Sequence, residues 1–199
     1  GGPARRRPRL SVPVEVRRPF AVAAVAVLLA WSVNSLYAAL GPSLAADILG
    51  DRNHVVGGLT IFLFYATAGA GQAGLRAWST RRAMAVGAVL LALGMALVAA
   101  ALATGSLLAF LGGTLVAGLG SGLCFLSGLT LVNQTAPAHQ RSEVVSAYNV
   151  VGYVALSLPV IGIGLLTGVI GLLTTTIVFT AAVVVLAAVT LAAAARALG

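Results

Sequence analysis

The chain has 199 residues, of which 60% are hydrophobic and only 8% are charged, and its mean hydropathy is +1.06. Because an ordinary soluble domain carries roughly 25% charged residues, this composition excludes a soluble globular fold. The net charge of +8 would suit a nucleic-acid partner, but the placement of the arginines favours membrane topology, so we expect no nucleic-acid partner.

The first 19 residues are basic and proline-rich, with six arginines and four prolines. Proline at these intervals disfavours a helix, so we predict an extended cytoplasmic tail at 1–19 and a membrane bundle at 20–199. A cleaved signal peptide is the alternative, but the apolar run from Phe20 is too long and five more runs follow it. The RRRPR motif is interpreted as the flank of a membrane helix rather than a localisation or nucleic-acid patch.

Six apolar runs follow the tail, and each is long enough to cross a bilayer core of roughly 30 Å. The sequence therefore predicts an all-α membrane protein with six transmembrane helices. The expected spans are Phe20–Leu40, Val55–Leu75, Ala83–Thr104, Leu107–Asn133, Val144–Thr167 and Leu172–Ala195.

Charge alternates between the connections of these spans. The tail, the second and fourth connections and the C-terminal end together hold 11 of the 12 arginines, and Arg52 is the exception. The positive-inside rule places the arginine-rich side in the cytoplasm. Both ends of the chain are then expected to be cytoplasmic, which an even number of spans allows.

Polar side chains are concentrated on spans one, two, four and five, whereas spans three and six are almost wholly apolar or carry only threonine. This period of three helices predicts two three-helix repeats, which must be inverted because three spans end on the opposite side of the membrane. Inverted repeats are typical of transporters. The polar residues of the four spans include Trp31, Asn34, Tyr37, Tyr65, Gln72, Ser121, Ser127, Thr130, Ser146, Asn149, Tyr153 and Ser157.

Small residues and proline indicate close packing and a bend. Two GxxxG spacings, Gly118 with Gly122 and Gly164 with Gly168, predict close helix contacts. Pro159 and Gly162 predict a bend in the fifth span that would free backbone carbonyls.

With these elements in place, the sequence resembles the C-terminal six-helix half of the major facilitator superfamily, and within it bacterial sugar or drug efflux permeases. The GLRAWSTRR segment at Gly74–Arg82 is similar to a degenerate copy of the family's cytoplasmic motif and lacks its aspartate. The other motifs are RRPF at Arg17–Phe20, YAALGPSLA at Tyr37–Ala45, GLCFLSG at Gly122–Gly128, QRSEVVSAYNVVGY within Ala136–Tyr153 and SLPVIGIG at Ser157–Gly164.

This resemblance implies a secondary transporter that moves a small organic solute by alternating access across a bacterial cytoplasmic membrane, with export as the expected direction. It further implies that the N-terminal six-helix half is the partner, that residues 1–19 are the central loop, and that spans one, two, four and five line the substrate path. Only Pro159 and Gly162 keep the spacing of the antiporter motif, so the coupling ion stays open.

The candidate site residues are the polar side chains on the four polar spans. Each of them either contacts substrate or bonds to a neighbouring helix, and Trp31 and Tyr37 are interpreted as packing or interfacial anchors. Four arginines, Arg76, Arg81, Arg82 and Arg141, either form a cytoplasmic gate or only set topology, with Ser142 as the expected N-cap of the fifth helix. The substrate-path candidates are Asn34, Tyr65, Gln72, Ser121, Ser146, Asn149, Tyr153 and Ser157.

Other functions are disfavoured by what the spans lack. No predicted span contains an ionisable residue apart from Tyr and Cys124, so this part of the protein holds no proton relay and an uncharged solute is expected. The two histidines lie in different connections, so we expect no metal, no cofactor and no histidine to activate Ser121 in an intramembrane protease. We therefore expect no enzyme. A self-contained channel or scaffold that homodimerises remains the alternative.

Overall fold

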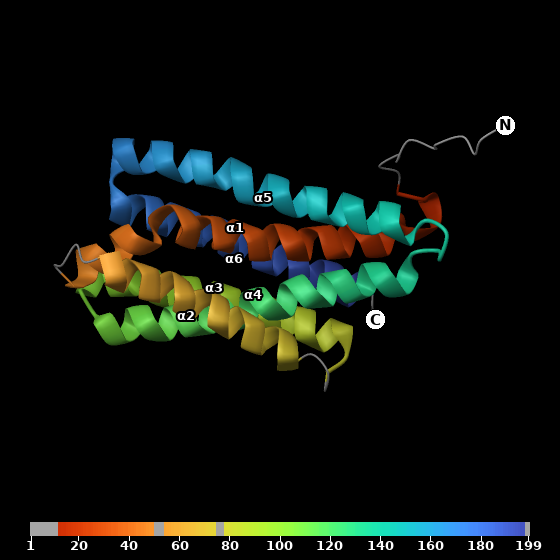
Figure 1. Ribbon diagram of the computed structural model, residues 1–199, viewed down its shortest axis with the longest axis horizontal. Helices are drawn as coiled ribbons and strands as arrows, with labels where there is room; N and C mark the ends of the chain where they lie inside the picture. The colour runs from red at the N-terminus through yellow and green to blue at the C-terminus, as the bar shows by residue number, and fades with distance from the viewer. Residues whose placement is uncertain (1–11, 50–53, 75–77, 198–199) are drawn as a thin grey trace.

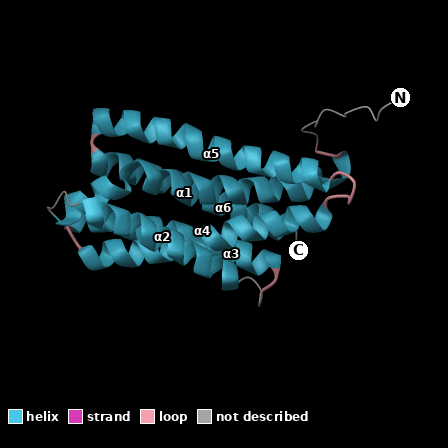
Figure 2. Cartoon of the chain, in the orientation of Figure 1, coloured by secondary structure: helices cyan, strands magenta, loops and turns pink. Residues whose placement is uncertain are grey.

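The computed structural model describes residues 12–49, 54–74 and 78–197, and every regular element within these ranges is a helix (Figure 2). This result confirms the all-α prediction. A short 3-10 helix precedes the six long helices. The elements are η1 (Val14–Val16), α1 (Arg17–Leu49), α2 (His54–Gly74), α3 (Thr80–Thr104), α4 (Leu107–Thr135), α5 (Arg141–Ile170) and α6 (Leu172–Ala197).

The largest difference from the predicted boundaries concerns α1, which begins at Arg17 and continues through Pro42 to Leu49. Proline does not prevent helix formation at residues 14–19, so the expected extended conformation is wrong for that part of the tail. Pro19 is tolerated because it lies in the first turn, where an N–H has no partner within the helix. The arginines at positions 5–9 lie outside the described residues.

The N-terminal end of α5 also differs from the prediction. The helix begins at Arg141, and Gln140 occupies the N-cap position without a side-chain hydrogen bond. Ser142 lies inside the first turn, so its prediction as the N-cap is wrong. The first turn carries Glu143, whose negative charge suits the positive end of the helix dipole.

The six helices run alternately up and down along one bundle axis (Figure 1). The start of α1, the α2–α3 connection, the α4–α5 connection and the end of α6 all lie at the same end of the bundle. All described arginines lie at this end, which we call the arginine end: Arg17, Arg18, Arg81, Arg82, Arg141 and Arg196. At the other end, tight connections pass through Gly105 and Gly171, whose φ values are +67° and +79°.

The centre of the bundle is formed by α1 and α4. They pack against each other, α4 also packs against α2 and α3, and α1 also packs against α2, α5 and α6. These two helices are the most buried of the candidate spans, and α5 is the least buried because it packs mainly on α1. The remaining four helices therefore surround a two-helix centre.

The two GxxxG spacings have different outcomes. A side chain added at Gly118 or Gly122 would overlap Thr67 or the backbone of Ala68, so these glycines allow α4 to lie directly against α2. A side chain added at Gly164 or Gly168 would meet nothing within 4 Å. The prediction of a close helix contact is confirmed for the first pair and is wrong for the second within the described chain.

Five of the helices, α1 and α3 to α6, are long and apolar enough to cross a bilayer. The remaining helix, α2, does not meet the same requirement of length and hydropathy over its described residues. The structure therefore supports five of the six predicted spans.

The apolar helices α3 and α6 pack against each other and present their other faces outward. On α3 the exposed face carries Val89, Leu93 and Leu97. On α6 the hydroxyls of Thr175, Thr176 and Thr190 donate hydrogen bonds to carbonyls four residues earlier, at 2.8 Å, and Thr180 donates to the Met95 carbonyl of α3. Apart from Thr174 in the first turn, the hydroxyls of α6 are thus satisfied inside the protein and leave an apolar surface.

Candidate functional site

Trp31 of α1 joins α4 and α5 near the middle of the bundle. Its ring meets the edge of Tyr153 with centroids 5.3 Å apart, and it lies 5.9 Å from the ring of Phe125. α5 approaches this closely because Gly152 faces the indole, where an added side chain would come within 3.2 Å of the ring. The three rings are only partly buried or exposed, so they form an aromatic surface rather than a closed core.

Asn34 lies one turn further along α1 and bonds across to α4. The Ser121 hydroxyl donates to the Asn34 Oδ1 at 2.9 Å. Ser121 is 3% exposed, so it does not lie on an accessible face, and its direct role is to hold Asn34. Asn34 is only half-buried and its amide N–H groups donate to no described residue, which leaves them available to a solute, to water or to another chain.

Tyr37 lies a further turn along α1 and connects it to α2 and α4. Its ring stacks on Phe64 with centroids 4.2 Å apart, and its hydroxyl donates to the Thr114 Oγ1 at 3.1 Å. Both side chains of this hydrogen bond are fully buried. The interpretation of Tyr37 as a packing residue is therefore confirmed, and the neighbouring Tyr65 extends the aromatic contact to the α2 surface, where it is 46% exposed.

The residues of these contacts lie close to the midpoints of their helices, which follows from the helix bounds. In an up-and-down bundle, midpoints lie at a common depth, so α1, α2, α4 and α5 contribute to one layer. Transporter binding sites are typically found at this depth. We call this layer the mid-bundle cluster; it consists of Trp31, Asn34, Tyr37, Phe64, Tyr65, Ser121, Phe125 and Tyr153.

Most of the polar stripe of α5 faces away from the contact with α1, and Tyr153, whose ring meets Trp31, lies at the edge of that contact. The buried residues of this helix include Val144, Tyr148, Gly152 and Ala155, which form the contact face. Ser146, Tyr153 and Ser157 are exposed and Asn149 is half-buried on the other side, and none of their polar groups bonds to a described residue.

On α2, Tyr65 and Gln72 share one face as their seven-residue spacing predicts. Gln72 is half-buried and, like the Tyr65 hydroxyl, bonds to no described residue. The structure thus brings Asn34 together with Ser121, and Tyr153 together with Trp31. It leaves Gln72, Ser146, Asn149 and Ser157 without hydrogen-bond partners in the described chain.

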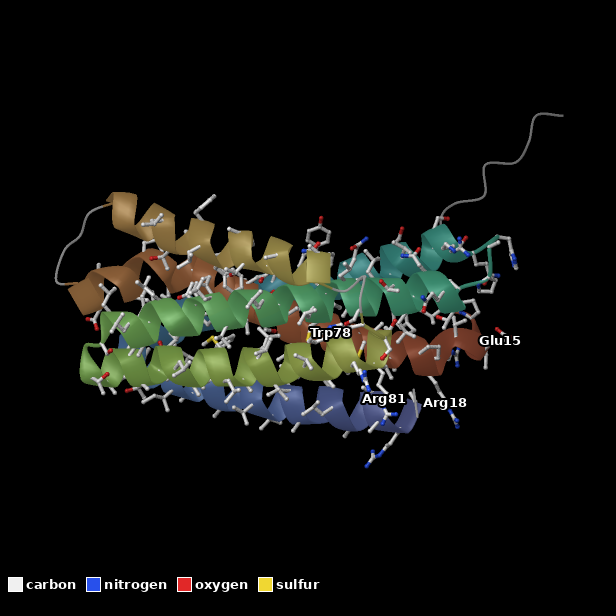
Figure 3. The ribbon with its side chains drawn as sticks, turned by 90° about the horizontal axis from the view of Figure 1, so that it is seen from below. Glu15, Arg18, Trp78 and Arg81 are labelled. Carbon is white, nitrogen blue, oxygen red and sulfur yellow. The ribbon has the colours of Figure 1, made fainter. Side chains whose placement is uncertain are left out.

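The candidate gate residues Arg81, Arg82 and Arg141 are exposed at the arginine end, and Arg18 and Arg81 are seen there in Figure 3. Arg76 lies outside the described residues. Through Pro159 and Gly162, α5 remains one continuous helix, so the bend stays a prediction.

The described charged residues lie only in connections or in the first or last turns of helices, as Asp47 and Arg196 illustrate. No group of three potential metal ligands occurs among the described residues. The mid-bundle cluster accordingly offers aromatic faces, hydroxyls and one amide, which are groups that can stack and form hydrogen bonds, and it contains no charged side chain.

Sequence reasoning missed Phe125, because a phenylalanine within an apolar run carries no signal that distinguishes it from core. It also assigned Trp31 only a packing or anchoring role. Trp78, a few residues after α2, was not singled out, although an aromatic residue beside a basic cluster is a recognised mark of the membrane interface.

The family model described as Major Facilitator Superfamily matches residues 2–159, which is most of the chain. No curated protein matches the sequence.

Proposed function

This chain belongs to the Major Facilitator Superfamily, and on that premise we propose that it forms one six-helix half of a secondary transporter. The family consists of membrane transporters rather than enzymes, and the chain is a multi-pass membrane protein. In our proposal it moves a small uncharged organic solute, such as a sugar or a drug-like molecule, by alternating access, with export as the direction.

The observation that carries the proposal is the unsatisfied polar stripe on α5. A polar group left without a hydrogen bond in hydrocarbon costs several kcal/mol, so membrane helices turn such groups toward protein or water. All threonines of α6 except Thr174 in the first turn meet this demand with bonds inside the protein, whereas Ser146, Asn149, Tyr153 and Ser157 do not. The α5 face therefore requires a second six-helix half or a water-filled path beside it.

The mid-bundle cluster supports the same function. Its rings and the free amide of Asn34 lie beside the α5 stripe, because Tyr153 belongs to both. A solute at this depth would find aromatic stacking surfaces and hydrogen-bond donors but no fixed charge. The coupling proton, if there is one, would then have to be carried by the other half.

The packing pairs support two inverted three-helix repeats. Exchanging α1 with α4, α2 with α5 and α3 with α6 turns each principal packing pair into itself or into another observed pair. For example, α3 with α6 is unchanged, and α1 with α5 becomes α4 with α2. The exchanged pairs differ in extent, most clearly α3 with α4 against α1 with α6. Two minor pairs, α1 with α3 and α5 with α6, become pairs that have almost no contact. This correspondence is what a duplicated unit related by a two-fold axis in the membrane plane predicts.

We place the arginine end in the cytoplasm of a bacterium, with the chain in its inner membrane, because positively charged connections are retained on that side. The residues that precede α1 would then belong to the central cytoplasmic loop between the two halves, and Arg81, Arg82 and Arg141 would face that loop.

Cysteine labelling tests the water-facing assignment. Tyr153 and Val185 are similarly exposed, at 60% and 62%, so geometry alone predicts equal labelling of Tyr153→Cys and Val185→Cys. We expect a membrane-impermeant polar thiol reagent to modify Tyr153→Cys and Asn149→Cys but not Val185→Cys or the buried native Cys124. Equal labelling at positions 153 and 185 would remove the proposed water-filled path.

A second measurement distinguishes half a transporter from the homodimeric channel or scaffold. Liposomes that contain only this purified chain should show no uptake of sugars or dyes above empty liposomes. Uptake by these liposomes, together with crosslinking between cysteines at position 153 of two copies, would replace the proposal with the homodimer.

A further inference from the structure

An apolar groove lies between α2 and α3 and runs from their ends nearest the arginine end to Leu119 and Leu123 of α4, on either side of Ser121 in the chain. Both helices pack against α4 but barely touch each other, so a cleft remains above α4. Its volume is about 240 Å³, and it is lined by Ala70, Gly71, Gly74, Trp78, Val86, Leu90, Leu119 and Leu123. None of the substrate-path candidates lines it.

The lining chemistry restricts what the groove can hold. Apart from the Trp78 indole, which carries one hydrogen-bond donor, its side chains are aliphatic or absent. A polar solute would leave its groups unpaired there, at a cost of roughly 1–3 kcal/mol for each. The volume is also below the roughly 300–1,000 Å³ of pockets that enclose drug-sized ligands, so a slender hydrocarbon chain fits better.

A basic residue near one end of the groove indicates that the hydrocarbon chain belongs to an anionic lipid. Arg82, Val86 and Leu90 are spaced by four residues on α3, so they lie on one helix face, and the last two line the groove. Arg82 therefore lies one turn closer to the arginine end, where its exposed side chain pairs with no described acid. Trp78 is 47% exposed and lies near Arg81, also at this end (Figure 3). Tryptophan and arginine are both enriched at the headgroup level of membranes.

We propose that the groove holds one acyl chain of an anionic phospholipid from the surrounding membrane, with its phosphate against the Arg82 guanidinium and its first carbons beside the Trp78 ring. The occupant is a lipid rather than a protein segment, because Trp78, which lines the groove, is a residue typical of the headgroup level, and Arg82, one turn beyond the lining, carries the charge that matches a phosphate. The site is separate from the proposed substrate path and does not depend on it.

Tryptophan quenching by brominated lipids tests this proposal, because the chain contains only Trp31 and Trp78. In the Trp31→Phe variant of the full chain, Trp78 is the sole emitter. The chain is reconstituted into vesicles that contain phospholipids brominated on the acyl chains, either phosphatidylglycerol or phosphatidylcholine at matched mole fractions. We expect phosphatidylglycerol to occupy the quenching position with about fivefold preference, which corresponds to about 1 kcal/mol for one basic residue.

Two matched pairs of variants locate the site. Arg82→Gln should abolish the preference for phosphatidylglycerol, whereas Arg81→Gln, on a different face of α3, should retain it. Ala70→Phe should fill the groove and reduce quenching by both lipids, whereas Ala66→Phe, one turn away and outside the lining, should not.

Four outcomes would overturn the proposal. They are equal quenching by the two lipids in the parent chain, equal loss of preference in both arginine variants, unchanged quenching in Ala70→Phe, and absence of quenching by either lipid. The second outcome would indicate general surface charge, and the last would indicate that a protein neighbour covers the groove.

Discussion

Replacing Gly122 by alanine should separate α2 from α4 and destabilise the bundle. A Cβ at position 122 would overlap the backbone carbonyl oxygen of Ala68. A flexible side chain could rotate away from such an overlap, but a carbonyl inside a helix moves only with the helix. The substitution therefore forces a shift of α2 along its contact with α4, one of the principal packing pairs of the bundle.

The expected magnitude follows from two opposing effects. Overpacking of a tight contact costs typically 1–3 kcal/mol. The change from glycine to alanine inside a helix returns roughly 0.5–1 kcal/mol, because alanine loses less conformational freedom on folding. The net loss of unfolding free energy should lie between about 0 and 2.5 kcal/mol, with a central value of about 1 kcal/mol.

The assay is reversible unfolding of the purified chain in mixed micelles with increasing sodium dodecyl sulfate, monitored by far-ultraviolet circular dichroism. Gly112→Ala is the matched control, because it makes the same chemical change in α4 where a Cβ would meet nothing within 4 Å. Gly164→Ala in α5 is a second control from the other GxxxG spacing. If Gly122→Ala is as stable as either control, the reasoning from the α2–α4 contact is refuted.

Two further predictions use other contacts. Leu93 is 54% exposed on α3, so Leu93→Arg should lower the amount of a fluorescent fusion protein in the membrane. The reason is that inserting an arginine at a lipid-facing helix centre costs about 2.5–3.5 kcal/mol. Unchanged amounts in the membrane would contradict the lipid-facing assignment. The hydrogen bond between Ser121 and Asn34 can be measured by a double-mutant cycle with Asn34→Ala and Ser121→Ala in the same unfolding assay. The coupling free energy should be about 0.6 kcal/mol and at most about 1.7 kcal/mol. Additive effects of the two substitutions would show that the pair does not join α1 to α4.

The sequence alone determined the helices and their up-and-down order. Long apolar runs separated by short polar connections define helix positions by local composition, and the alternation of arginines defines which ends lie together. The ends of α1 were predicted wrongly because both were placed near prolines. A proline in the first turn of a helix is tolerated. A proline within a membrane helix, such as Pro42, is also tolerated when the neighbouring structure supports it.

The sequence also indicated which helices carry polar faces, but it did not separate the roles of the residues on them. Asn34 and Ser121 were both interpreted as substrate-path candidates. In the structure Asn34 is half-buried beside the aromatic surface, whereas Ser121 is buried and holds Asn34 by a hydrogen bond. The contact between Tyr153 and Trp31 could be found only from the structure, because the two residues lie on helices that are far apart in the chain.

Only the tertiary structure decided which of two identical GxxxG spacings is a contact and where the groove beside Trp78 lies. Hydropathy and spacing are properties of a single helix and repeat wherever the composition repeats. Contact, burial and clefts depend on how two helices cross, and that crossing is set jointly by the side chains of all the neighbours that pack around them.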